Sequence, residues 1–168
     1  MEQNILLVSG GNDSICIYNK YDSKLKFNLI YFNYGQKYMK EELKRLPDNT
    51  EVITMKNLQI DTNGYVKGRN LLFLIEIAKR FDNATIYMGS NKEDTFPDNN
   101  YKYLTTAIKV INISFNTNLK IVLPLRNKTK TYIMNYINNY NLNTYSCYKG
   151  GKTPCNKCKA CLSIKNAT

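Results

Sequence analysis

The feature that most constrains the fold is a regular alternation between short apolar runs and longer segments of helical period. Five runs rich in Ile, Val, Tyr and Phe are typical of buried strands, at residues 5–8, 27–32, 52–55, 85–88 and 119–123. Helix candidates lie between and after them, at residues 14–20, 36–46, 70–81, 101–114 and 129–140. Because strands that are apolar throughout are covered on both faces, the pattern predicts an α/β fold with a Rossmann-like, doubly wound, parallel five-stranded sheet.

A loop with two glycines follows the first predicted strand without a spacer, in the order Ser9, Gly10, Gly11, Asn12, Asp13 and Ser14. Open α/β sheets bind ligands beyond the carboxyl ends of their strands. Glycines let the backbone close on an anion, and amides at a loop–helix junction add positive potential. The loop therefore predicts a phosphate site, in which Ser9 and Ser14 donate hydroxyl hydrogen bonds and Asp13 fixes the turn or helps to hold Mg²⁺. The alternative is a plain strand–helix turn with a polar cap.

Length and composition limit the number of domains, the expected location and the catalytic groups that the protein can use. The 168 residues suffice for one domain, and no apolar run reaches the length of a membrane helix. The N-terminus lacks the arrangement of a signal peptide, so we expect a cytoplasmic protein. The formal charge of +11 is compatible with a nucleic-acid partner, but the lysines are scattered and we expect none. The sequence contains no histidine, so catalysis would depend on positioning, phosphate electrostatics, carboxylates or thiolates.

Four cysteines cluster near the C-terminus, and their spacing is Cys-x7-Cys-x2-Cys-x2-Cys. They are Cys147, Cys155, Cys158 and Cys161. Four thiolates at this spacing can surround Zn²⁺ tetrahedrally and leave no open position, which predicts a structural zinc site. An iron–sulfur cluster is the alternative, and disulfides are not favoured without an export signal.

The glycine loop resembles the loop of the ATP pyrophosphatases, which cradles the pyrophosphate end of ATP. With the cysteine cluster, the chain resembles the 7-cyano-7-deazaguanine synthase family of queuosine biosynthesis. Further matches are FNYGQK at 32–37, YVKGRN at 65–70, GSNKED at 89–94 with PD at 97–98, PLRNKTK at 124–130 and SCYKGG at 146–151. The similarity spans nearly the whole chain. It implies an adenine nucleotide alpha hydrolase-like domain at residues 1–144 and a zinc-binding tail at 145–168 packed on it.

The resemblance implies a ligase that uses ATP, Mg²⁺ and Zn²⁺. It would adenylate 7-carboxy-7-deazaguanine, form the amide with ammonia and dehydrate the amide to the nitrile with a second ATP. A homodimer is also implied.

The resemblance also assigns residues to this reaction. Arg69, Lys130 and Asp13 are the candidate catalytic residues. Besides the loop at 9–14, Tyr34, Gly35 and Gln36 would line the nucleotide side, or would form only a tight turn. The candidates for substrate binding are Asn70, Asn91, Asp94 and Asp98, where an Asp would accept hydrogen bonds from the amino edge of the base.

Other functions stay open at this point. The enzyme could stop at the amide, or join the activated acid to another amine such as a protein terminus. A tRNA-modifying ATPase would use the positive charge, and a zinc-knuckle nucleic-acid binder would use Tyr145 and Tyr148 for base stacking. The knuckle leaves the glycine loop unexplained.

Overall fold

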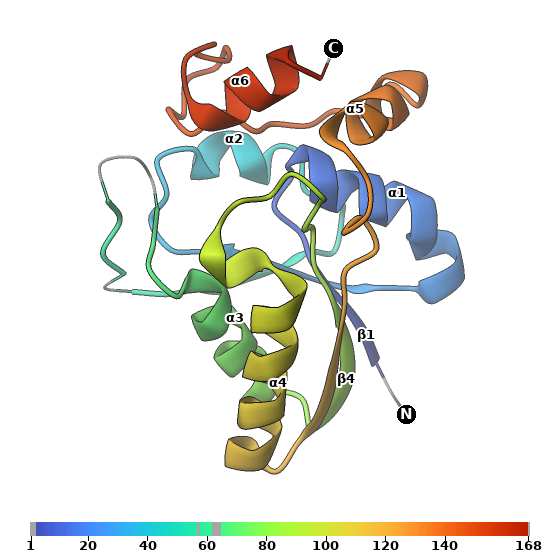
Figure 1. Ribbon diagram of the computed structural model, residues 1–168, viewed down its shortest axis with the longest axis vertical. Coiled ribbons are helices and arrows are strands. Elements are labelled where there is room, and N and C mark those ends of the chain that lie inside the picture. Colours follow the sequence, from blue (N-terminus) through green and yellow to red (C-terminus); the bar gives the residue numbers. More distant parts are fainter. Residues whose placement is uncertain (1–2, 57, 62–64, 168) are drawn as a thin grey trace.

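A sheet of five parallel strands forms the centre of the computed structural model, which describes residues 3–56, 58–61 and 65–167 (Figure 1). The strands are β1 (Gln3–Leu7), β2 (Asn28–Asn33), β3 (Glu51–Thr54), β4 (Asn83–Tyr87) and β5 (Asn118–Val122). Their order is β3-β2-β1-β4-β5, and every neighbouring pair is parallel. The predicted doubly wound sheet is confirmed.

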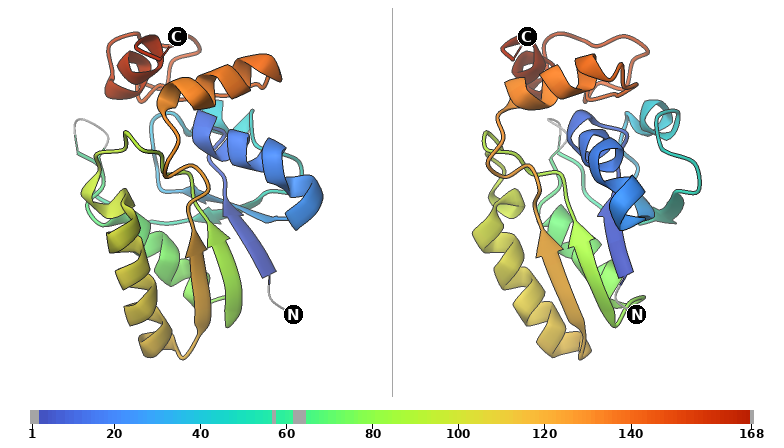
Figure 2. Two further views of the ribbon diagram at one scale, coloured as in Figure 1. Left: turned by 45° about the vertical axis from the view of Figure 1, so that its right-hand side comes forward. Right: turned by 90° about the vertical axis from the view of Figure 1, so that its right-hand side faces the viewer.

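Helices cover both faces of the sheet (Figure 2). One face carries α1 (Asn12–Leu25), on which α5 (Lys130–Asn139) packs near the carboxyl edge, and the other carries α3 (Arg69–Ala78) and α4 (Tyr101–Phe115). Side chains alternate along a strand, so Ile5 and Leu6 of β1 belong to different apolar clusters, and both are fully buried. None of the helices in the described residues is long and apolar enough to cross a membrane.

The helices differ from the sequence prediction in three places. The segment predicted as a helix at 36–46 contains only α2 (Met39–Leu43), because the side chain of Gln36 bonds back to Tyr34 N and holds a turn before it. Two short elements were not predicted: the 3₁₀ helix η1 (Pro97–Asn99) and α6 (Lys159–Lys165). Both are too short to show a helical period in the sequence.

The C-terminal tail, residues 145–167, lies over the carboxyl edge of the sheet beside α2 and α5 (Figures 1 and 2). Tyr145 N donates to Gly10 O over 2.9 Å, which joins the tail to the glycine loop. Gly150 lies so close to the loop after β2 that a Cβ would stand 2.3 Å from Lys37 O. The tail is therefore positioned to wall any ligand site at this edge.

Candidate functional site

Two adjoining cavities lie at the carboxyl edge. The first cavity has a volume of about 290 Å³ and the second of about 400 Å³. Of the predicted site residues, the first cavity is lined by Ser9, Gly11, Asn12, Asp13, Ser14, Tyr34, Gln36, Arg69, Asn70, Asn91, Asp94 and Lys130. Asp98 lines only the second cavity, and Gly10 and Gly35 line neither. The fold thus gathers residues from five separated segments around one space.

The glycine loop is held in shape by its own hydroxyl groups. Ser14 Oγ accepts from Ser9 N over 3.1 Å and donates to Gly11 O over 3.2 Å, and Ser9 Oγ accepts from Gly11 N over 3.3 Å. Gly10 has φ +70°, and a Cβ there would stand 2.7 Å from Glu42 O. Both serines therefore organise the loop, and Gly10 permits its close approach to α2.

The N-terminus of α1 presents unpaired amides beside the first cavity. Within the described part of the chain, the backbone N–H groups of Asp13 and Ser14 make no hydrogen bond. Helix α5 also begins at this cavity, with Lys130 in its first position. Unpaired amides and helix N-termini attract anions, so this end of the cavity suits phosphate.

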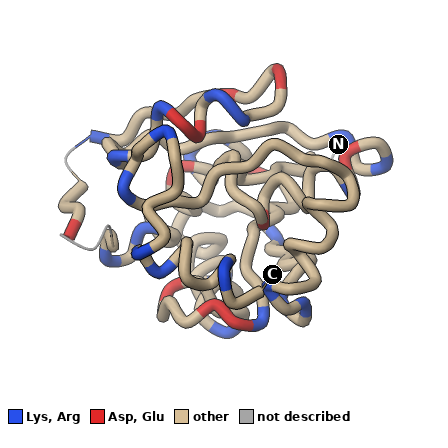
Figure 3. Tube along the Cα trace, turned by 90° about the horizontal axis from the view of Figure 1, so that it is seen from above, with Lys and Arg blue, Asp and Glu red and all other residues tan. Residues whose placement is uncertain are grey.

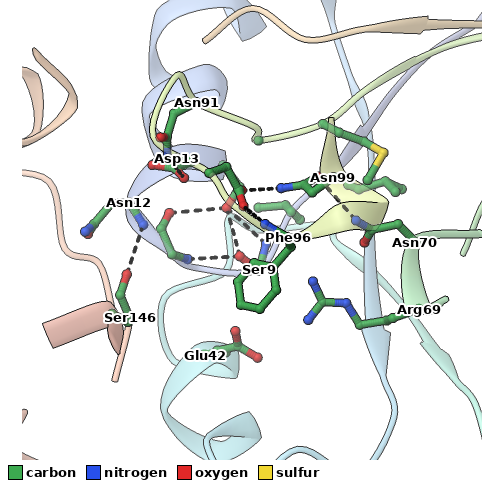
Figure 4. A pocket seen from close by; sticks show the side chains of 18 of the residues that line it. Ser9, Asn12, Asp13, Glu42, Arg69, Asn70, Asn91, Phe96, Asn99 and Ser146 are labelled. Atoms are coloured by element: carbon green, nitrogen blue, oxygen red, sulfur yellow. Dashed lines mark hydrogen bonds between the residues drawn. The ribbon is translucent and has the colours of Figure 1, made fainter. Parts of the chain in front are cut away.

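Asp13 and Lys130 form an ion pair between α1 and α5. Lys130 Nζ lies 2.8 Å from Asp13 Oδ1, and Asn91 Nδ2 donates to Asp13 Oδ2 over 3.0 Å (Figure 4). Three residues that are far apart in the sequence are thereby fixed at one rim. The carboxylate orients the ammonium and leaves it beside the phosphate end of the cavity.

Asn12 has a structural contact where the sequence suggested a nucleotide contact. Its side-chain oxygen accepts from Thr144 Oγ1 over 2.6 Å, and its amide nitrogen donates to Met134 Sδ over 3.3 Å. Its backbone N–H donates to Ser146 Oγ over 3.4 Å. Asn12 therefore connects the glycine loop with α5 and the tail.

Arg69 enters the first cavity from the start of α3. Nη1 donates to Tyr34 Oη over 3.1 Å, whereas the buried Nε has no hydrogen-bond partner. Among the described residues, no carboxylate lies within 4.0 Å of the guanidinium. An arginine keeps its charge in proteins, so a buried guanidinium that no carboxylate contacts directly can bind an anionic ligand.

Glu42 forms part of the floor of the first cavity and was not predicted. Its Oε2 accepts from Tyr31 Oη over 2.7 Å and from Gln36 Nε2 over 3.0 Å. Burial raises the pKa of the Glu42 carboxyl to about 7, although the hydrogen bonds from Gln36 and Tyr31 oppose the shift. Figure 4 shows Glu42 and Arg69 directed into the same space. Gln36 therefore binds protein groups with its side chain. No motif in the sequence indicates that Glu42 lines a cavity.

Three of the four predicted substrate residues, Asn70, Asp94 and Asp98, belong to one network rather than to a free polar loop, whereas Asn91 bonds to Asp13. Asn70 Nδ2 donates to Asp98 O over 2.9 Å and to Asn99 Oδ1 over 3.2 Å. Asn99 in turn donates to the carboxylate of Asp94, whose pKa burial raises above its usual value. This network connects α3 with η1. Gly35, which has φ +82°, is exposed in the turn after β2.

The four predicted cysteines of the tail converge. The Sγ atoms of Cys147, Cys155, Cys158 and Cys161 all lie within 4.8 Å of one another. The amide of Cys158 donates to Cys155 Sγ over 3.3 Å, and the amides of Lys157 and Cys158 lower the pKa of the Cys155 thiol to about 6. Such a cluster of potential thiolates can hold a metal ion. Cys16, by contrast, belongs to α1 and is buried in the core.

The tail also contributes residues to the first cavity that sequence reasoning did not assign to it. Tyr145, Ser146, Tyr148 and Lys159 line it, and Lys159 Nζ donates to Thr95 Oγ1 over 2.6 Å across the rim. Two of these residues flank Cys147. The sequence linked this segment to the family motif at 146–151, to the predicted metal ligand and to base stacking in a zinc knuckle, and none of these indicated a cavity wall.

Comparison with known proteins decides the family. The family model described as queuosine biosynthesis protein QueC matches residues 46–168. The chain belongs to the QueC family. The resemblance seen in the sequence motifs is therefore confirmed.

Curated relatives extend the similarity over nearly the whole chain. The 7-cyano-7-deazaguanine synthase of Methanobrevibacter smithii is 26% identical and covers 97% of this chain and 91% of its own. The synthase of Leptospira interrogans serovar copenhageni is 29% identical, with 96% and 84% covered. That of Sulfurihydrogenibium sp. is also 29% identical, with 99% and 94% covered. The glycine loop precedes the segment matched by the QueC model.

A solved structure shares the fold. It is described as a predicted subunit of tRNA methyltransferase from Methanocaldococcus jannaschii, and it has a TM-score of 0.51 at 18% identity. The match covers 80% of this chain and 73% of that chain. At this identity the likeness concerns the α/β architecture alone.

Proposed function

We propose that this member of the QueC family is an ATP-dependent ligase that converts 7-carboxy-7-deazaguanine and ammonia to 7-cyano-7-deazaguanine. The names of the relatives support the product. One observation carries the proposal: the glycine loop, the unpaired amides of α1, Lys130 and the Arg69 guanidinium, whose Nε has no partner, all face one cavity. These groups suit the binding of several anionic groups side by side.

The reaction must first turn an inert carboxylate into an acyl group with a good leaving group. A carboxylate oxygen attacks the α-phosphorus of ATP and pyrophosphate leaves. Ammonia then attacks the acyl carbon, loses a proton and expels AMP, which gives the amide. The amide oxygen attacks a second ATP in the same way, pyrophosphate leaves and one N–H proton is lost. Loss of AMP, which takes the amide oxygen, together with the second N–H proton leaves the nitrile.

The residues of the first cavity match these demands. The loop and the α1 amides would hold the departing pyrophosphate, and Lys130, oriented by Asp13, would neutralise its developing charge. Arg69 would hold the carboxylate in line with the phosphorus. Catalysis would then depend on holding both anions in place, and it would not need a histidine base, which the sequence lacks.

Both predicted metals fit residues of the chain. Mg²⁺ is held by carboxylates and substrate phosphates, and Asp13 is the carboxylate at the phosphate end. Bound beside Asp13, Mg²⁺ would offset the negative charge of the phosphates. Zn²⁺ with bonds of about 2.3 Å to four sulfurs separates them by about 3.8 Å. Cys155 Sγ and Cys161 Sγ lie 3.9 Å apart, so we propose zinc in the cysteine cluster.

We further propose that residues 145–168 act as a zinc-stapled part of the domain at residues 1–144. The hydrogen bonds from Tyr145 to Gly10 and from Asn12 to Ser146 support this arrangement. A homodimer and a cytoplasmic location stay predictions.

Product analysis tests the proposed reaction. The purified protein is incubated with the acid, ATP, Mg²⁺ and ammonia, and products are measured by mass spectrometry, with ammonia omitted as the control. We expect the nitrile and two AMP per nitrile. Accumulation of the amide would show a ligase that stops one step earlier. Without AMP formation in either mixture, the assignment of the glycine loop to ATP is wrong.

A further inference from the structure

We propose that the second cavity is the subsite for the deazaguanine base, and that Arg69 at its junction with the first cavity holds the acid's carboxylate. The inference rests on the proposed function and specifies where the acid binds. It also moves the base away from Asn91 and Asp94, which line only the first cavity and bond to Asp13 and Asn99.

The position of the second cavity suits a substrate that must reach ATP. It lies between the turn after β2, the start of α3, η1 and the tail, and its volume of about 400 Å³ is that of a small-molecule site. Arg69, Phe96 and Tyr148 line both cavities. A ligand in the second cavity therefore reaches the first one past the Arg69 guanidinium, whose buried Nε has no partner.

The walls of the second cavity are aromatic on two sides. The rings of Tyr65 and Phe96 stack with centroids 5.7 Å apart and an angle of 3° between their planes. Tyr148 packs on Tyr38 from the tail side, with centroids 5.7 Å apart. Flat aromatic surfaces favour a planar heterocycle, because stacking is tolerant of the exact ring system.

Asp98 supplies the group that would read the base. It is buried, and its Oδ2 accepts from Asn70 N over 3.3 Å. In the described residues no other donor reaches this carboxylate, and no ion pair joins it to Arg69. The six-membered ring of 7-carboxy-7-deazaguanine carries an N–H and an amino group side by side, and its carboxylate lies on the other ring. A carboxylate and a guanidinium at two places in one cavity match these two ends.

Positive charge around the second cavity supports an anionic ligand. Lys37, Lys149 and Lys157 line it, and none of them forms an ion pair with a described residue. In the view from above, onto the tail, Lys and Arg segments are spread over many parts of the chain (Figure 3). Their field would draw the acid towards the cavity before it binds.

A comparison of two ligands tests the subsite. Binding of 7-carboxy-7-deazaguanine and of its analogue without the 2-amino group is measured calorimetrically on the wild type, Asp98→Asn and the remote control Asp82→Asn. We expect the wild type and the control to prefer the acid by about tenfold or more, as for a hydrogen bond to a charged group. We expect Asp98→Asn to lose this preference. A general loosening of α3 would weaken both ligands alike and leave the ratio unchanged.

A second variant keeps the test decisive if Asp98→Asn does not fold. Tyr65 lines only the second cavity, so Tyr65→Ala should raise the KM for the acid and leave the KM for ATP unchanged. Suppose that the wild type turns over the acid, but the variants keep the wild-type preference between the two ligands and the wild-type KM values, or raise only the KM for ATP. The proposed subsite is then wrong, whereas the proposed reaction stands. If the wild type neither binds nor converts the acid, both proposals are overturned.

Discussion

The buried carboxyl of Glu42 should make the protein lose stability as pH rises, and Glu42→Gln should remove that loss. Its pKa is raised from 4.5 to about 7 by burial, so the folded state favours the protonated form. Stability from this group is therefore fully present below pH 4.5 and is lost as pH rises through 7. The shift corresponds to about 3 kcal/mol in full.

The amide of the variant can take over the hydrogen bonds of the carboxylate. Its oxygen can accept from Tyr31 and Gln36 as Oε2 does, and it carries no charge at any pH. The free energy of unfolding of Glu42→Gln minus that of the wild type should therefore grow by about 2.5 kcal/mol between pH 5 and pH 9. That corresponds to a difference in Tm of about 5–10 °C at pH 9 for a chain of this size.

Urea denaturation at pH 5, 7 and 9 measures the difference directly. Glu76→Gln is the matched control, because Glu76 lies on the surface of α3 in an ion pair with Lys79. Its difference from the wild type should vary with pH by much less. If the Glu42→Gln difference is flat across this range, or if the variant loses stability at pH 9, Glu42 is ionised without penalty and the account of the cavity floor is wrong.

Three further predictions concern the loop, the ion pair and the metal. Gly10→Ala should destabilise the protein more than Gly35→Ala. Both glycines have positive φ, but of the two only Gly10 would bring a Cβ against backbone, at 2.7 Å from Glu42 O. Equal losses in the free energy of unfolding by urea, each of about 1–2 kcal/mol, would show that the contact yields. In AMP-release assays, Lys130→Met should lower kcat/KM by about 100-fold or more, whereas Lys128→Met should change it little. If the two variants lower kcat/KM to a similar extent, the role of the ion pair is contradicted. Removing the metal with a chelator, or Cys158→Ser, should lower the Tm and abolish ATP binding together, because the tail walls the first cavity; retention of ATP binding after metal loss would refute this coupling.

Much of this protein could be predicted from the sequence because the deciding signals are local. Apolar runs and helical spacing depend on the hydrophobic effect acting on neighbours in the chain, and they predicted all five strands and the parallel sheet. The cysteines were equally clear, because ligands to one metal lie close together in the chain. Their convergence within 4.8 Å confirms the cluster, which can hold a metal ion, while zinc stays a proposal.

Contacts between distant segments could be decided only by the tertiary structure. The pairing of Asp13 with Lys130 depends on how α1 and α5 pack, and the burial of Glu42 depends on the approach of Gly10 to α2. The junction of the two cavities at Arg69 likewise requires the tail to lie over the carboxyl edge. Residue type and spacing therefore determined which chemical groups are available, whereas packing determined which of them are charged, paired or left unpartnered.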